Sequence, residues 1–123
     1  MNLTTVCEFI QNAYWGKHLR KDELVKSFQF SYCVGLFGNK RQLGFARVVS
    51  DRSTCAYVKD FFILADFQRR GYGRQLLQGL MNHPDLADVS NWYLGTKNAH
   101  AFYEANGFVN SPDGIYMFFN RDL

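Results

Sequence analysis

The sequence predicts a mixed α/β fold with one central sheet, in which some strands run antiparallel and others parallel. Two β-rich stretches, residues 30–37 and 41–50, are separated only by the turn residues Gly38-Asn39-Lys40, which is typical of an antiparallel hairpin. A third β-rich stretch, residues 54–64, leads through a glycine-containing loop into a helical pattern. The later strands are separated by helices, which indicates crossover connections and parallel pairing.

Two helices are expected before the hairpin. Thr4 or Thr5 can cap the first one, in which apolar residues recur at helical spacing until Gly16 ends it. The second helix, residues 20–28, carries two acidic residues near its start, where negative charge suits the positive end of the helix dipole. Residues 51–53 are expected to form the turn before the third strand.

After the third strand, a helix is expected from about Gly71. Residues 82–85 stop it, because Pro84 restricts the residue before it and cannot continue a helix. Asn98 is the expected cap of the last helix, and Gly107 is suited to its end. The remaining expectations are an apolar helix face of Leu76, Leu77, Leu80 and Met81, a strand over 91–96, a helix over 98–106 and a last strand over 115–120.

Length and composition favour a single domain over residues 1–123. Hydrophobic residues make up 47% of the chain and aromatic residues 17%, which is enough for a core and argues against disorder. The formal net charge of +3 is mildly basic and well short of a nucleic-acid-binding tail. We therefore expect no nucleic-acid partner.

The cysteine pattern argues against zinc or any other metal site. Cys7, Cys33 and Cys55 are widely spaced, with no CxxC pair and no His/Cys cluster. They are expected to be buried free thiols in a reducing compartment. The first residues lack the basic stretch of a secretory signal, and no apolar run approaches membrane-spanning length. A soluble cytoplasmic protein without a membrane partner is therefore expected.

The loop Gln68-Arg69-Arg70-Gly71-Tyr72-Gly73 joins the third strand to a helix, and its composition suits an anion. The first N–H groups of a helix have no partner within it and lie at the positive end of its dipole. The two glycines bring no side chain that would hold an anion away, and Arg69, Arg70 and Arg74 add positive charge. The loop is neither a Walker loop nor a dinucleotide fingerprint, which would need GK[ST] or a third glycine at position 76. The alternative is a glycine turn that only packs a helix onto a strand.

This loop and a second stretch make the chain resemble the GNAT superfamily of acyl-CoA-dependent N-acetyltransferases. The family signature Q/R-x-x-G-x-G/A after a strand is matched by Gln68 to Gly73. Residues 96–108, TKNAHAFYEANGF, are similar to the second motif, N-x-x-A-x-x-x-Y-x-x-x-G-F, with Thr96 standing where the motif has asparagine. The resemblance covers nearly the whole chain and extends to a subgroup of short bacterial members. It implies a GNAT-like fold, a twisted mixed sheet with helices on both faces, here with the family's first strand missing or trimmed.

The resemblance also implies acetyl-CoA as co-substrate, bound where two strands splay apart. Its pantetheine arm would pair with Phe61 to Ile63 as an added strand, and its pyrophosphate would rest on the backbone of the loop and the next helix. Asn98 is placed to reach the pantetheine arm or an ordered water, or only to cap its helix. The implied binding residues are Phe61, Phe62, Ile63, Gln68, Arg69, Arg70, Gly71, Tyr72, Gly73, Arg74, Asn98 and Tyr103.

Acetyl transfer to an amine needs a neutral amine, a donor for the developing oxyanion and a proton for the leaving thiolate. By the family match Tyr103 is the candidate acid, because a phenol with an unperturbed pKa of about 10 is protonated at neutral pH. The alternative is a tyrosine that only packs in the core. His100, one turn away, is a candidate base on account of its titration near neutral pH, with surface or cap packing as its alternative.

Asp60 is the main candidate for the general base, since it lies on the strand that leads into the splay. Strand alternation would put Asp60 and Phe62 on one face and Phe61 and Ile63 on the other. The alternative is a salt bridge with Lys59, Arg47 or another neighbour, because a charge buried without a partner is costly.

The predicted function is an acetyl-CoA-dependent N-acetyltransferase acting on a primary amine of a small molecule or peptide, as a monomer or homodimer. Two alternatives remain open. One is a non-catalytic acyl-CoA-binding or sensing module of the same fold, and the other is an interaction or nucleic-acid-binding protein that uses the three arginines of the loop. Candidates for acceptor recognition lie in and between the first two helices: Tyr14, Trp15, Lys17, His18, Arg20 and Phe28.

Overall fold

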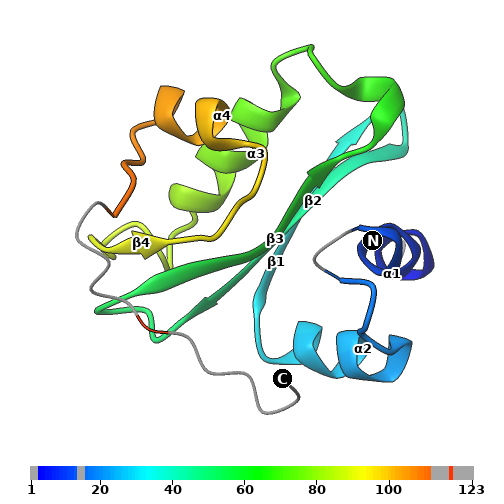
Figure 1. The fold of residues 1–123 in the computed structure, drawn as a ribbon, viewed down its shortest axis with the longest axis horizontal. Coiled ribbons are helices and arrows are strands. Elements are labelled where there is room, and N and C mark those ends of the chain that lie inside the picture. Colours follow the sequence, from blue (N-terminus) through cyan, green and yellow to red (C-terminus); the bar gives the residue numbers. More distant parts are fainter. Residues whose placement is uncertain (1–2, 14–15, 112–116, 118–123) are drawn as a thin grey trace.

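The structure is a computed structural model that describes residues 3–13, 16–111 and 117 of the chain. Figure 1 shows its elements in the predicted order. They are α1 (Leu3–Asn12), α2 (Lys21–Gln29), β1 (Tyr32–Gly38), β2 (Arg41–Ser50), β3 (Ala56–Ile63), the 3₁₀ turn η1 (Ala65–Phe67), α3 (Tyr72–Met81), β4 (Trp92–Tyr93) and α4 (His100–Ala105). The strand predicted over 115–120 lies outside the described residues, apart from Met117.

The sheet has the strand order β1-β2-β3-β4. The two pairs β1/β2 and β2/β3 are antiparallel, and β3/β4 is parallel, so the predicted mixed sheet is confirmed. The hairpin between β1 and β2 turns through Asn39 and Lys40, whose φ angles of 49° and 64° are both positive, as a type I′ turn requires. The prediction that Thr4 or Thr5 caps the first helix is wrong, because α1 already begins at Leu3 and includes both.

The parallel pairing is short: the strand predicted over 91–96 is present, but β4 spans only Trp92–Tyr93. Only Ala56↔Trp92 and Tyr57↔Tyr93 pair between β3 and β4. Beyond Tyr93 the chain leaves β3, so residues 94–96 make no ladder and line a pocket instead. The two strands therefore splay apart from a point near Tyr57.

An extra residue in β3 lies just past that point. Arg47 pairs with Asp60 and Val48 with Val58, so Lys59 has no counterpart on β2. Such a bulge shifts the alternation of side chains by one residue. Val58 and Ile63 consequently belong to the same core cluster, although an unbroken strand would place them on opposite faces.

Helices cover both faces of the sheet, as expected, with α1 and α2 on one side and α3 and α4 on the other (Figure 1). Under α3, the core consists of Ala46, Val48, Ala56, Val58, Ile63, Leu76, Leu80, Leu86 and Val89. Under α1 and α2, it consists of Val6, Cys7, Ile10, Leu24, Phe45 and Phe62. Because Phe62 belongs to the second core and Phe61 and Ile63 to the first, the predicted split of these residues between two faces is confirmed.

Gly16 lets the chain turn back tightly after α1. A Cβ atom at this position would lie 2.1 Å from the carbonyl oxygen of Ile10, which is far inside van der Waals contact. The connection that follows carries Leu19 back to the sheet, where it lines a pocket beside β3. Within the described part of the chain, no helix combines the length and apolarity needed to cross a membrane.

Candidate active site

A groove of about 760 Å³ runs along the end of β3, between α1, the loop before α3, and α4. Every residue predicted to bind the cofactor lines it, except Arg70 and Tyr72. Tyr72 packs instead against the core under α3, and the Arg70 guanidinium lies 6.0 Å from the ring centroid of Phe67. The predicted loop and strand residues therefore meet in one continuous groove.

The backbone at the mouth of α3 has the shape that the sequence suggests for an anion. Gly71 is the N-cap residue, with φ 82° and ψ 3°, and a Cβ atom there would meet nothing within 4 Å. Glycine is thus needed for its left-handed conformation and leaves open space in front of the helix. Arg69 also has a positive φ, 63°, and left-handed residues in such loops turn successive N–H groups toward one concavity.

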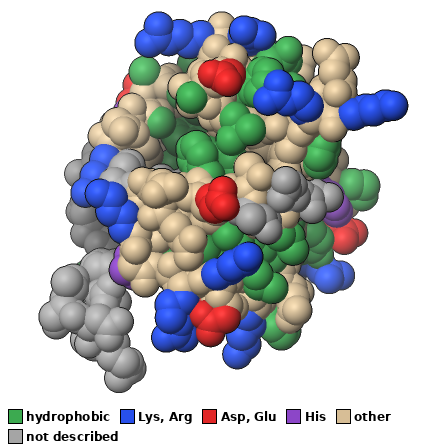
Figure 2. Space-filling model, turned by 90° about the vertical axis from the view of Figure 1, so that its right-hand side faces the viewer, with side chains coloured by type: hydrophobic (Ala, Val, Ile, Leu, Met, Phe, Trp, Pro, Cys, Tyr) green, Lys and Arg blue, Asp and Glu red, His purple; other side chains and the backbone are tan. Residues whose placement is uncertain are grey.

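Side chains hold the loop in place. The Gln68 side-chain amide donates a hydrogen bond from Nε2 to the carbonyl oxygen of Ile63 at 2.9 Å, which ties the loop to the end of β3. At Gly73 a Cβ atom would lie 3.1 Å from the ring of Phe102, so the first turn of α3 approaches α4 closely. Figure 2 shows apolar side chains in the hollow of one face, with Lys and Arg side chains gathered along its upper and lower edges.

A smaller pocket, of about 210 Å³, lies inside the splay between β3 and the chain after β4. Leu19 closes it from the α1–α2 connection, and Tyr57, Lys59 and Asp60 contribute from β3. It shares four lining residues with the groove: Phe61, Asn98, Ala99 and Tyr103. The two cavities therefore meet at one place, which is where a group carried in the groove would reach a molecule in the pocket.

Tyr103 lies at this meeting point. Its side chain belongs to α4 and is buried, with 9% of the residue exposed. Its ring centroid lies 5.0 Å from that of Phe102, 5.7 Å from that of Phe108 and 6.0 Å from that of Phe61, each in an edge-to-face arrangement. Tyr103 therefore packs among aromatic rings and also lines the groove and the pocket, while its role as the acid stays a prediction.

Asp60 forms a buried ion pair, the alternative weighed from the sequence. Its Oδ2 accepts a hydrogen bond from Arg47 Nε at 2.5 Å, and the two side chains are 2% and 5% exposed. Arg47 also donates from Nη1 to the hydroxyl of Ser31 at 3.2 Å, and its guanidinium lies 5.8 Å from the ring centroid of Phe28. Asp60 also lines the small pocket, so the residue that forms the ion pair is part of the pocket wall.

Cys33 is the neighbour of this pair on β1, opposite Arg47. Burial raises the pKa of the Cys33 thiol, while the Arg47 cation opposes the shift and the Asp60 carboxylate adds to it. Burial likewise raises the pKa of the Cys7 thiol. Cys7, Cys33 and Cys55 are all free, although only Cys7 is fully buried.

The prediction that Asn98 caps the last helix is wrong. The N-cap residue of α4 is Ala99, and its backbone N–H donates to the hydroxyl of Thr96 at 3.1 Å. Thr96, which departs from the family motif, thus supports the start of α4. Asn98 is exposed and lines both cavities.

The other candidates are spread over the molecule. His100 lies on α4 away from both shared cavities, and it lines a different pocket with Tyr93. Lys17 and His18 are exposed on the α1–α2 connection, and His83 accepts a hydrogen bond at Nδ1 from the Asp85 N–H. Arg20 pairs with Asp22 and Glu23, Phe28 packs in the second core, and Tyr14 and Trp15 lie outside the described residues.

Sequence reasoning missed several lining residues. Phe102 directly precedes the motif tyrosine, so its place could have been inferred from the motif. Phe9 and Ala13 of α1 and Leu19 of the connection reach the cavities only through tertiary packing, for which the local sequence gives no signal. Among the residues that the structure describes, no group of three or more His, Cys, Asp and Glu side chains is arranged to hold a metal.

Comparisons with known proteins agree with this geometry. Residues 30–110 match the family described as "Acetyltransferase (GNAT) domain". The chain is 28% identical over 120 residues to an uncharacterised N-acetyltransferase, ycf52, of Pyropia yezoensis, covering 94% of this chain and 69% of the relative. The ycf52 protein of Gracilaria tenuistipitata var. liui is 34% identical over 80 residues, covering 63% and 44%.

Solved structures share the fold. One from Xanthomonas campestris pv. campestris, assigned to the GNAT acetyltransferases, is 30% identical, with a TM-score of 0.89 over 98% of this chain and 87% of that one. The ribosomal-protein-S18-alanine N-acetyltransferase of Escherichia coli is 22% identical, with a TM-score of 0.68 over 86% and 70%, a likeness of fold alone. The family match, the relatives and the first of these structures together show that the chain belongs to the GNAT family of acetyltransferases.

Proposed function

We propose that this protein transfers an acetyl group from acetyl-CoA to a primary amine of a small molecule or peptide. The observation that carries the proposal is the meeting of two cavities at Phe61, Asn98, Ala99 and Tyr103. One cavity has the shape and charge for a nucleotide thioester, and the other is a small chamber for an acceptor. A cytoplasmic location fits the free state of all three cysteines.

The groove fits acetyl-CoA at both of its ends. At the phosphate end, Gly71 opens the mouth of α3, whose first N–H groups have no partner within the helix, and Arg69 and Arg74 supply positive charge. Along the arm, β3 pairs with β2 on one side, but within the described residues its other side has no strand partner beyond Tyr57. A linear amide chain can add to such an edge through main-chain hydrogen bonds.

The reaction balances with these two substrates alone. The neutral amine nitrogen forms a bond to the acetyl carbonyl carbon, the carbon–sulfur bond breaks, and the products are an amide and the free thiol. The amine loses one proton and the sulfur gains one. Tyr103 is the residue proposed to donate a proton to the departing sulfur, since it lines the cavities where they meet.

Asp60 is the residue proposed to accept the amine proton, directly or through water. Arg47 holds the carboxylate in the pocket wall through a charge-assisted hydrogen bond, and Ser31 holds Arg47. The position of Asp60 is therefore fixed by Arg47 on β2, which Ser31 holds in turn from the segment before β1.

The test is turnover with a panel of primary amines, following thiol release and the mass of the acetylated product. Tyr103→Phe keeps the ring packing and should lower kcat about 10²–10⁴-fold, the usual contribution of an acid or base. Tyr32→Phe is the matched control, because Tyr32 lies on β1 and lines neither cavity. Binding of CoA without turnover of any amine would instead support the non-catalytic sensing module. Full activity of Tyr103→Phe would remove Tyr103 from the acid role.

A further inference from the structure

The small pocket has an uneven charge. Lys59 and Asp60 are the charged residues among those that line it. The Asp60 carboxylate is neutralised by Arg47, with which it shares a hydrogen bond and an ion pair inside the protein. Among the described residues that line the pocket, Lys59 therefore carries the one positive charge that no lining carboxylate balances.

Lys59 lies at the bulge in β3 and has no counterpart on β2. It lines the same pocket as Asp60, the residue that follows it. The Lys59 ammonium lies 5.9 Å from the ring centroid of Tyr57. The ion pairs between described residues join Arg20 to Asp22 and Glu23, and Arg47 to Asp60, so none of them engages Lys59.

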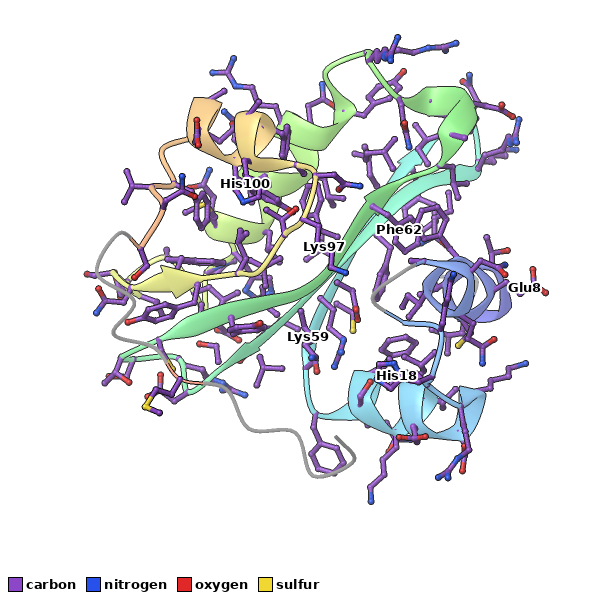
Figure 3. All side chains as sticks on the ribbon, viewed as in Figure 1. Glu8, His18, Lys59, Phe62, Lys97 and His100 are labelled. Carbon is purple, nitrogen blue, oxygen red and sulfur yellow. The ribbon has the colours of Figure 1, made fainter. Side chains whose placement is uncertain are left out.

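A second lysine lies in the neighbouring connection. Lys17 is exposed and lies two residues before Leu19, which closes the pocket. In Figure 3, Lys59 lies on β3 near the middle of the molecule, His18 lies on the α1–α2 connection, and His100 lies apart from both at α4. A pocket of this charge repels a bare ammonium ion, whereas an acceptor that also carries an anion compensates it.

We infer that the acceptor is a short primary amine that carries a carboxylate or phosphate, and that Lys59 binds this anionic group. The inference rests on the proposed function and names its substrate class. The pocket, of about 210 Å³, is much smaller than the groove of about 760 Å³, so it suits a short acceptor. Lys59 and Asp60 line the same pocket, so one small molecule can reach Lys59 with its anion and Asp60 with its amine.

The test compares acceptors that differ in the anion. Acetylation of phosphoethanolamine and ethanolamine, and of glycine and glycinamide, is measured with the wild type and with Lys59→Met. Loss of a hydrogen bond to a charged group should lower kcat/KM for the anionic member of a pair about tenfold or more, with little change for the neutral member. A loss confined to phosphoethanolamine indicates that Lys59 binds a phosphate, and a loss confined to glycine indicates that it binds a carboxylate. Lys26→Met is the matched control, because Lys26 is exposed on α2 and lines neither cavity.

Comparing the variant with the wild type on the same acceptor removes differences in the intrinsic reactivity of the amines. Acetylation of neutral amines with no dependence on Lys59 in either pair would overturn the inference and leave the proposed function intact. If none of the amines tested leads to thiol release, the proposed function is overturned and the inference with it. A calorimetric titration with acetyl-CoA then checks that Lys59→Met still binds the thioester as the wild type does.

Discussion

The buried ion pair between Arg47 and Asp60 makes stability sensitive to the loss of one partner. In Arg47→Met the Asp60 carboxylate, with 2% of its side chain exposed, would stay inside the protein without its counter-ion. The substitution also removes the hydrogen bond to Ser31, whereas the methionine keeps an apolar stem beside Phe28. Removing one partner of a buried pair typically costs about 3–5 kcal/mol, and we expect a loss of stability in this range.

Urea unfolding followed by circular dichroism measures this loss of unfolding free energy. In thermal unfolding, the same loss should lower the Tm of a chain of this size by roughly 10–20 °C. The double variant Arg47→Met with Asp60→Leu replaces both charges by apolar groups and should recover most of the stability. A loss below about 1 kcal/mol in the single variant, or a double variant as unstable as the single one, would refute the reasoning.

Three further predictions concern stability and thiol chemistry. Gly16→Ala should lower the free energy of unfolding in urea by about 1–3 kcal/mol, because its Cβ would meet the backbone of Ile10. Gly79→Ala, with open space around it, should raise this free energy by about 0.5–1 kcal/mol. Equal stabilities of the two variants would contradict the close approach at Gly16. Hydrogen bonds from the Thr54 hydroxyl and from backbone N–H groups lower the pKa of Asp51. The wild type should therefore be more stable than Asp51→Asn above the unfolded pKa of about 3.9, and this difference in unfolding free energy should vanish as the pH falls through the folded pKa. Unfolding measurements across pH in which the difference grows in acid would oppose this. Cys7 should alkylate more slowly than a free thiol at neutral pH, since burial raises its pKa, and rapid labelling detected by mass spectrometry would count against its burial.

Local signals in the sequence were sufficient for much of the fold and the groove. β2 has the predicted bounds, residues 41–50, because its β-rich run is bounded by clear turn residues on both sides. The loop Gln68 to Gly73 lines the groove as expected, apart from Arg70 and Tyr72. The anion site proposed there consists of consecutive backbone groups and a helix end, which are properties of one short segment.

Predicting the small pocket, where the acceptor is proposed to bind, requires information that no single segment contains. The bulge at Lys59 arises from the register between β2 and β3, and it decides which face each residue of β3 presents. The partner of Asp60 follows from the same register, so the sequence left Arg47 as one of several candidates. Thr96 and Asn98 are both good caps by residue type, and only the early departure of the chain from β3 selects Thr96 to support α4.

Calorimetric titration with acetyl-CoA, CoA and dephospho-CoA tests the central claim most directly. The wild type should bind all three saturably, because dephospho-CoA keeps the pyrophosphate that the loop is proposed to hold. Gly71→Glu places a carboxylate and an unfavourable left-handed residue at the mouth of α3 and should lose binding, whereas Gly79→Glu, on the exposed side of the same helix, should keep it. Circular dichroism establishes that both variants are folded. Absence of binding by the wild type, or wild-type affinity in a folded Gly71→Glu, would contradict the assignment of this loop to the pyrophosphate of acetyl-CoA.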